Sequence, residues 1–142
     1  MLTVTCLGSV YSGTKPKQLK TSIDSLLLGT HRPSQIVLAI DGAISSTLEQ
    51  LIATYFSRFL IDTIRLNVNQ GLFAALNQAL DICSSEIICR FDTDDVNVAD
   101  RLLRIQQAFS QDQSIDIIGS FVLEFSNKGI GCISCSTKLV PV

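Results

Sequence analysis

The feature that most constrains this 142-residue chain is an apolar run, Ile87 to Phe91, that leads directly into Asp92-Thr93-Asp94-Asp95. Its Ile and Phe side chains are typical of a buried, interior strand. Three crowded carboxylates repel one another and lose hydration, so a neighbouring group has to offset their charge. On an extended backbone Asp92 and Asp94 project to the same side, whereas Asp95 belongs to the following turn.

A divalent cation offsets such a cluster most directly. Hard carboxylate oxygens suit Mg²⁺ or Mn²⁺, and Mg²⁺ usually keeps one or two protein carboxylates and takes its other ligands from water and substrate phosphates. Asp92 and Asp94 therefore indicate a metal site for a phosphorylated ligand. The alternative is a solvated turn whose carboxylates cap the next helix. An EF-hand loop is excluded, because counting from Asp92 puts Asn97 where Gly is needed and Leu103 where Glu is needed.

Composition limits the fold and the partners. With 46% hydrophobic and 17% charged residues the chain can bury a sizeable core, and we expect residues 1–142 to form one domain. A net charge of −2 argues against a nucleic-acid partner. No apolar run approaches the roughly 18 residues that span a bilayer, and the N-terminus lacks a signal-peptide pattern. We therefore predict a cytoplasmic protein without a transmembrane segment.

Short apolar runs alternate with apolar stripes at helical spacing, which predicts successive β-α units. The predicted strands are Leu2–Leu7, Ile36–Ile40, Ile64–Asn67 and Glu86–Phe91, and the predicted helices are Leu19–Leu27, Leu48–Phe56, Leu72–Cys83 and Leu102–Phe109, the last with Asp100 as N-cap. Further runs follow at 115–120, 121–125 and 130–133, with Asn127-Lys128-Gly129 as a turn. The expected fold class is α/β: a three-layer α/β/α sandwich with a mostly parallel sheet, ending in a short hairpin.

Polar residues follow these runs at the edge where open α/β sheets bind ligands. Tyr11, near the end of the first run, either stacks on a flat ring or packs under its own loop. Asp41 delivers another carboxylate, although Asp-Gly is also ordinary turn chemistry. Asn69 and Gly71 precede a predicted helix, where phosphate or ribose can approach, although capping alone would explain both residues.

Other nucleotide-binding and phosphorylated classes are less well supported. Neither G-x-G-x-x-G nor G-x-x-x-x-G-K-[ST] occurs, so a dinucleotide oxidoreductase and a P-loop NTPase have no support. A response-regulator-like domain needs a Lys at the end of a late strand, and neither Lys128 nor Lys138 fits that place.

The order of these features resembles the family 2 glycosyltransferases of the GT-A fold, which is Rossmann-like. The matching segments are Ser9-Val10-Tyr11-Ser12, Ser22 to Leu27, Ile36 to Gly42, Asn69-Gln70-Gly71 with Ala75 to Leu80, Phe91 to Asp95 as the D-x-D motif, and Asp100-Arg101. They run through nearly the whole chain in the family's order. The chain departs from the usual pattern at Ile40, where many members have another Asp, and at Ala43, which is often Ser.

The resemblance implies a domain that binds a nucleotide-diphosphate sugar, with UDP-sugar as the expected donor, together with Mn²⁺ or Mg²⁺. The sugar would pass to a glycan or lipid-linked acceptor, as in bacterial surface-polysaccharide glycosyltransferases, in the cytoplasm or at the inner face of the membrane. In the family the first-strand loop and the Asp after strand two hold the base, and the D-x-D pair holds ribose and metal. The candidate nucleotide-binding residues are Ser9, Tyr11, Asp41, Asn69, Gly71 and Asp92. The candidate metal ligands are Asp92 and Asp94, and Asp95 is expected to support them without binding the metal.

Family members usually continue for at least another hundred residues, which carry the acceptor site and the catalytic base. The resemblance covers the nucleotide-sugar half only, so we expect a truncated transferase domain and assign no catalytic residue. Two alternatives stay open: a non-catalytic nucleotide-binding or assembly module, and a nucleotidyl or phosphoryl transferase. An open apolar edge after Val142 would also suit pairing into a homodimer.

Overall fold

The computed structural model describes residues 2–57, 61–120, 122–126 and 129–132. These residues fall into two compact units, Met1–Gln111 and Asp112–Val142. The first unit contains every candidate site residue.

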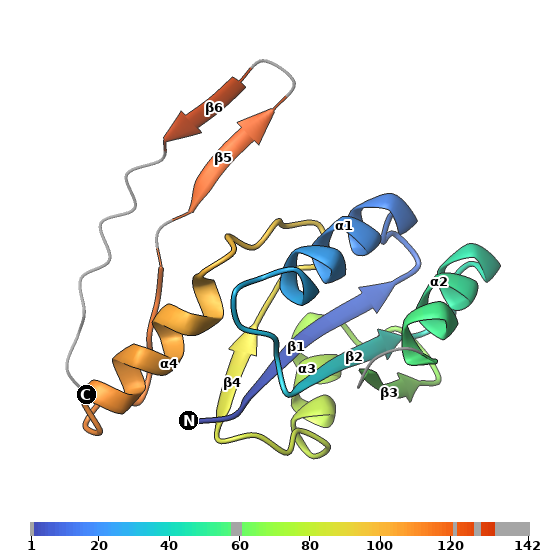
Figure 1. Cartoon of the computed structure of the whole chain (residues 1–142). Coiled ribbons are helices and arrows are strands. Elements are labelled where there is room, and N and C mark those ends of the chain that lie inside the picture. Colours follow the sequence, from blue (N-terminus) through green and yellow to red (C-terminus); the bar gives the residue numbers. More distant parts are fainter. Residues whose placement is uncertain (1, 58–60, 121, 127–128, 133–142) are drawn as a thin grey trace. The chain divides into compact units, whose positions relative to one another are not determined.

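The first unit is built on a four-stranded, all-parallel sheet with the strand order β3-β2-β1-β4 (Figure 1). Its strands are β1 (Val4–Tyr11), β2 (Gln35–Asp41), β3 (Ile61–Leu66) and β4 (Ile87–Arg90). Its helices are α1 (Pro16–Leu27), α2 (Ser46–Phe56), α3 (Leu72–Leu80) and α4 (Arg101–Gln111). Strands and helices alternate along the chain, as the β-α pattern predicts.

Helices cover both faces of this sheet and confirm the predicted three layers. Apolar side chains of α1, α2 and α4 share one core with alternate residues of all four strands. On the other face the small residues Ala75 and Ala79 of α3 pack against Leu7, Val37 and Ala39. Because alternate residues of a strand point to opposite faces, the continuous apolar run of β2 is buried along its whole length.

Strand β1 is longer than the sequence predicts, because it continues through Gly8 to Tyr11 instead of ending at Leu7. Parallel pairing with β2 extends to the last residue, where Tyr11 lies opposite Asp41. The Phe91 ring packs over Gly8, where a Cβ atom would approach the ring to 2.7 Å. Glycine here therefore serves close packing within a strand and does not mark its end.

Strand β4 was predicted to be interior, and this is wrong for the part of the chain that the structure describes. It pairs with β1 alone and lies at the edge of the sheet. Ile87 and Cys89 are buried, but Ile88 is 42% exposed. Ile88 is exposed because α3 packs on β1, β2 and β3, which leaves the second face of β4 without a helix over it among the described elements.

The second unit contains two antiparallel strands, β5 (Leu123–Ser126) and β6 (Gly129–Cys132). The turn residues Asn127 and Lys128 lie outside the described residues, so the hairpin ending stays a prediction. The apolar run at 115–120 forms no strand and pairs with no other described segment. Ile117 is accordingly 80% exposed. Within the described ranges no helix is long and apolar enough to cross a membrane.

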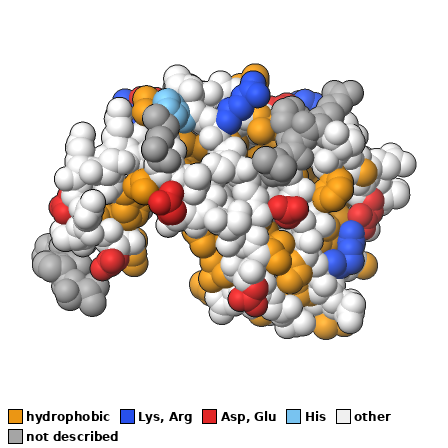
Figure 2. All heavy atoms as spheres, turned by 60° about the horizontal axis from the view of Figure 1, so that its bottom comes forward, with side chains coloured by type: hydrophobic (Ala, Val, Ile, Leu, Met, Phe, Trp, Pro, Cys, Tyr) orange, Lys and Arg blue, Asp and Glu red, His pale blue; other side chains and the backbone are white. Residues whose placement is uncertain are grey.

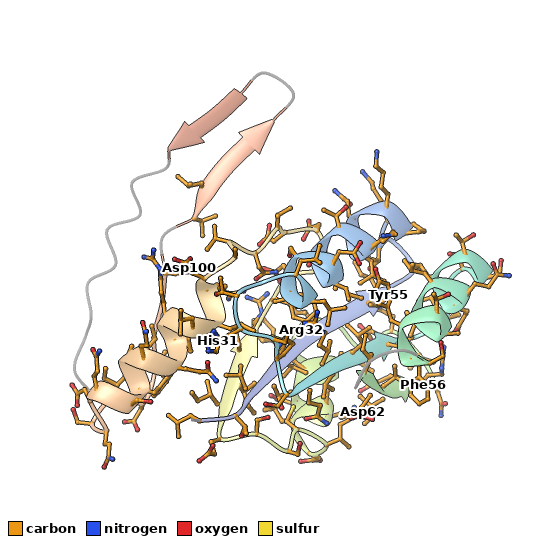
Figure 3. All side chains as sticks on the ribbon, in the orientation of Figure 1. His31, Arg32, Tyr55, Phe56, Asp62 and Asp100 are labelled. Carbon is orange, nitrogen blue, oxygen red and sulfur yellow. The ribbon has the colours of Figure 1, made fainter. Side chains whose placement is uncertain are left out.

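Tyr55, which Figure 3 labels, belongs to α2. Its hydroxyl donates to Asp24 Oδ1 of α1 at 2.5 Å and so joins the two helices. Partial burial opposes ionisation of Asp24, but the hydrogen bonds from Lys20 and Tyr55 outweigh it and hold the pKa of this carboxyl below its usual 3.8. A lowered folded-state pKa contributes stability that is present above pH 3.8 and is lost as the pH falls through the folded-state value.

We therefore expect Tyr55→Phe to lower the free energy of unfolding at pH 7 by about 1 kcal/mol, because a half-solvated hydrogen bond to a carboxylate is lost. The difference should shrink in urea titrations below pH 3.8, where Asp24 becomes protonated. Tyr11→Phe is the control, since the Tyr11 side chain is half exposed. A difference that is the same at pH 3 and pH 7 would contradict the role of Asp24.

Candidate functional site

The carboxyl ends of β1, β2 and β4 open into one cleft of about 380 Å³. This volume lies within the range of small-molecule sites. The cleft is lined by Ser9, Tyr11, Gly13, Thr14, Lys15, Gln18, Asp41, Asn69, Gly71, Leu72, Asp92, Thr93 and Asp94. The structure thus brings together all candidate nucleotide and metal residues, whereas Asp95 does not line the cleft.

The floor of the cleft holds a buried carboxylate. Asp41 is 3% exposed, and its two oxygens accept the backbone N–H groups of Gln70 at 2.7 Å and of Gly71 at 2.9 Å. These bonds compensate the cost of burying a charge and fix the orientation of the carboxylate. Because a carboxylate can accept about four hydrogen bonds, lone pairs remain for a ligand.

Two glycines allow the segments around Asp41 to meet. Gly42 has φ +82°, and a Cβ atom there would lie 2.8 Å from the backbone N of Asn69. Gly71, at the start of α3, has φ +88°. Residues with side chains rarely adopt this conformation. The Asp41-Gly42 turn and the Asn69–Gly71 loop are therefore locked together, so Asn69 and Gly71 face the cleft from a fixed position.

An aromatic side chain forms the wall beside β1. Tyr11 is 50% exposed, and its ring packs over Gly13, where a Cβ atom would approach the ring to 2.5 Å. The turn after β1 is closed by bonds from Thr14 N to Tyr11 O at 3.0 Å and from Tyr11 N to Thr14 Oγ1 at 3.1 Å. Tyr11 thus packs against its own loop and also lines the cleft with a half-exposed ring, so both alternatives for this side chain stay open.

The turn after β4 also lines the cleft, and in it Asp95 N donates to Asp92 O at 3.2 Å. Arg90 pairs with Asp92 at 2.5 Å, and both side chains are about half exposed. Asp94 is exposed, and its carboxylate has no hydrogen bond or ion pair with any other described residue. Asp94 is therefore the carboxylate of this turn that is most available to a cation.

Partial burial and the crowded charges of this turn raise the pKa of Asp95. Partial burial is the largest cause, followed by the negative charges of Asp92 and Asp94, while Arg101 and Arg90 act in the opposite direction. The turn therefore carries uncompensated negative charge beside the cleft.

The carboxylates of the cleft fit only a divalent metal that takes most of its ligands from phosphate and water. No group of three His, Cys, Asp or Glu side chains that could hold a metal occurs in the described ranges. An ion held entirely by protein ligands is thus not supported by these residues. Mg²⁺ and Mn²⁺ sites completed by phosphate oxygens and water need only one or two carboxylates, which Asp94 and Asp92 can supply.

Six cleft residues were not predicted from the sequence. Lys15 matters most among them, because it brings a positive charge to the cleft at the start of α1. The Lys15-Pro16 pair could have indicated it, since proline favours the first position of a helix. The others are Gly13, Thr14, Gln18, Leu72 and Thr93. Asp100, predicted as an N-cap, precedes α4 but pairs through its carboxylate with Arg104.

Positive charge is not concentrated elsewhere on the face that Figure 2 shows, where the described Lys and Arg side chains do not gather into one patch. This agrees with the net charge of −2. The features of a phosphate-backbone surface are thus missing from this view of the described residues.

Comparison with known proteins supports the resemblance. A family model described as "Glycosyl transferase family 2" matches residues 10–130. The UDP-Gal:alpha-D-GlcNAc-diphosphoundecaprenol beta-1,3-galactosyltransferase of Escherichia coli is 30% identical over 128 residues, which cover 87% of this chain and 46% of that enzyme. The chain spans about half the length of the curated relatives it matches.

Solved structures share the fold. S. aureus TarS 1–349 in complex with UDP-GlcNAc matches with a TM-score of 0.69 and 16% identity, over 79% of this chain and 32% of that chain. The mannosyltransferase PcManGT from Pyrobaculum calidifontis, in complex with GDP-Man and Mn²⁺, matches with a TM-score of 0.70 and 16% identity, over 80% and 34%. The predicted GT-A fold is confirmed.

We expect Asp41→Asn to destabilise the chain by about 1–3 kcal/mol, because an amide NH₂ would face a backbone N–H that the carboxylate now satisfies. Urea unfolding measures the loss. Asp94→Asn is the matched control, since it makes the same change on an exposed side chain and should alter stability by less than about 0.5 kcal/mol. Equal unfolding midpoints for the two variants would show that the bonds to Gln70 and Gly71 do not hold this loop.

Proposed function

Because the chain belongs to glycosyltransferase family 2, we propose that its cleft binds a nucleotide-diphosphate sugar, with UDP-sugar as the donor, for transfer to a glycan or lipid-linked acceptor. The observation that carries this proposal is that one cleft brings together an aromatic ring, a buried carboxylate, and a turn of carboxylates available to a cation. The ring and the buried carboxylate suit a base, and the carboxylate turn suits a diphosphate with its metal.

The base end of the proposed site is formed by Tyr11 and Asp41. The half-exposed Tyr11 ring offers a face for stacking, and Asp41 has lone pairs left to accept an N–H of the base. A carboxylate that accepts but cannot donate suits the N3–H group of uracil. The relative that uses UDP-Gal and the neighbour bound to UDP-GlcNAc support this choice. The neighbour bound to GDP-Man makes a guanine donor the competing possibility.

The diphosphate end is formed by the carboxylate turn and Lys15. Asp94, with Asp92 beside it, would hold Mn²⁺ or Mg²⁺, and the neighbour with GDP-Man and Mn²⁺ supports a metal of this class. When bound, such an ion supplies Lewis-acid stabilisation of the leaving diphosphate. Lys15 adds a positive charge to the lining of the cleft, while Ser9, Asn69 and Gly71 shape the space for the nucleotide.

Sugar transfer itself needs one more group. The acceptor oxygen forms a bond to C1 of the sugar, the bond from C1 to the diphosphate oxygen breaks, and the hydroxyl proton passes to a base. The proposal uses the cleft carboxylates Asp41, Asp92 and Asp94 for the nucleotide and metal, and all three line the cleft. We therefore propose that this chain binds donor but transfers sugar poorly by itself, and that the base and the acceptor site belong to a larger protein.

The same observation favours a second candidate, a nucleotide-binding module without transferase activity. The two functions differ in one measurement. Release of UDP from a UDP-sugar only when acceptor is added indicates the transferase, whereas binding without turnover in a full-length protein indicates the module.

The metal role is tested by calorimetric titration of UDP with and without Mn²⁺. We expect Mn²⁺ to tighten binding at least about tenfold, because it offsets the charge between diphosphate and carboxylates. Asp94→Ala should remove most of this gain and leave the metal-free affinity unchanged or improved. Glu49→Ala is the control, because its exposed carboxylate pairs with Arg65 and does not line the cleft. Equal UDP affinity with and without Mn²⁺ would eliminate the metal.

The contribution of Lys15 is tested by comparing UDP with uridine. We expect Lys15→Ala to weaken UDP about twofold to fivefold, as for an exposed ion pair, and to leave uridine unchanged. Lys17→Ala is the matched control, because Lys17 belongs to the same helix and does not line the cleft. Equal losses for UDP and uridine would place Lys15 away from the phosphates.

A further inference from the structure

Helix α1 is bonded to the carboxylate turn by side chains of its own. Ser22 is fully buried, and its hydroxyl donates to the backbone O of Asp92 at 3.1 Å. One turn later the Ser25 oxygen accepts Asn97 N at 3.0 Å and Asn97 Nδ2 at 3.1 Å, while its hydroxyl donates to Ser22 O at 2.6 Å. The two hydroxyls therefore connect one helix to both ends of the segment 92–97.

The polar residue at position 22 is not required by the helix. Ser22 lies in the buried stripe of α1 together with Leu19, Ile23 and Leu26. Alanine would fit the same space and favours the helix more strongly than serine does. A buried hydroxyl costs free energy unless it is hydrogen-bonded, and here it reaches Asp92, 70 residues further along the chain. The partner of the hydroxyl is therefore the turn and not the helix.

The turn depends on such bonds because of its place in the sheet. It follows an edge strand that is paired on one side only, so no neighbouring described strand steadies its other side. Asp92 O accepts both the Ser22 hydroxyl and Asp95 N, which makes it the point where helix and turn meet. Asp94, in the middle of this turn, has no partner of its own in the described chain.

We propose that Ser22 and Ser25 are positioning residues that hold the segment 92–97 in place, so that Asp92 and Asp94 face the cleft in one arrangement before a ligand binds. One consequence rests on the proposed function: the two hydroxyls determine how much a divalent metal increases the affinity for a nucleoside diphosphate. They are not expected to contribute to recognition of the base.

The first experiment needs no ligand. Amide hydrogen exchange is measured on the chain with Ser22→Ala, with Ser25→Ala, and with Thr21→Ala as control. Thr21 belongs to the same helix, is exposed, and donates its hydroxyl to Lys17 O within that helix. We expect exchange of the Asp95 amide, whose bond to Asp92 O closes the turn, to become about threefold to tenfold faster in both serine variants, as for the loss of one hydrogen bond, with no change in the Thr21 variant. Ser25 is half-buried, so its variant gives a result even where Ser22→Ala fails to fold.

The second experiment is calorimetry with three probes: uridine, UDP, and UDP with Mn²⁺. We expect the increase in UDP affinity that Mn²⁺ causes to be about threefold to tenfold smaller in the serine variants than in the unmodified chain. The affinity for uridine should be the same in all of them. A purely structural role would weaken all three probes together.

Unchanged exchange of the Asp95 amide in both serine variants overturns the proposal. So does faster exchange spread evenly over β1 and β2, because that indicates general destabilisation. If the unmodified chain binds no UDP, the proposed function fails and the effect on affinity fails with it. The hydrogen-exchange result still decides whether Ser22 and Ser25 hold the turn.

Discussion

The parallel pairing of β1 with both β2 and β4 is the constraint on which the site depends. Tyr11 lies opposite Asp41 in one register, and Leu7 lies opposite Arg90 in the other. Because the strands run in the same direction, their carboxyl ends reach the same edge of the sheet. Asp92 follows Arg90 by two residues and so lies beside the end of β1. The aromatic ring, the buried carboxylate and the carboxylate turn are therefore neighbours because of backbone pairing.

The carboxylates at this edge differ in how their charge is compensated. Asp41 is buried and satisfied by two backbone amides, which orient it whether or not a ligand is present. Asp92 is paired with Arg90, whereas Asp94 is exposed and has no described partner. A site of this kind combines one preorganised acceptor with carboxylates that gain from a cation. This division follows from burial and not from residue type, since all three are aspartates.

The sequence was sufficient for features that depend on local pattern, and insufficient for those that depend on tertiary packing. Continuous apolar runs predicted the strands, and polar residues at their ends predicted Tyr11, Asp41, Asp92 and Asp94 at one edge. The extension of β1 through Gly8 depends on the Phe91 ring from another strand, which no local pattern contains. The apolar run at 115–120 forms no strand, because such a run becomes a strand only where another strand pairs with it.

The role of the serines of α1 is another feature that the local sequence pattern does not reveal. Along the helix, Ser22 is a small residue in an apolar stripe, and nothing in its spacing separates it from alanine. Its bond to Asp92 appears only when the fold brings β4 beneath α1. An edge strand lacks the second neighbour that steadies an interior strand, so the turn that follows it has to be held from the helical layer. Buried hydroxyls are suited to this, because each is stable only while its partner stays in place.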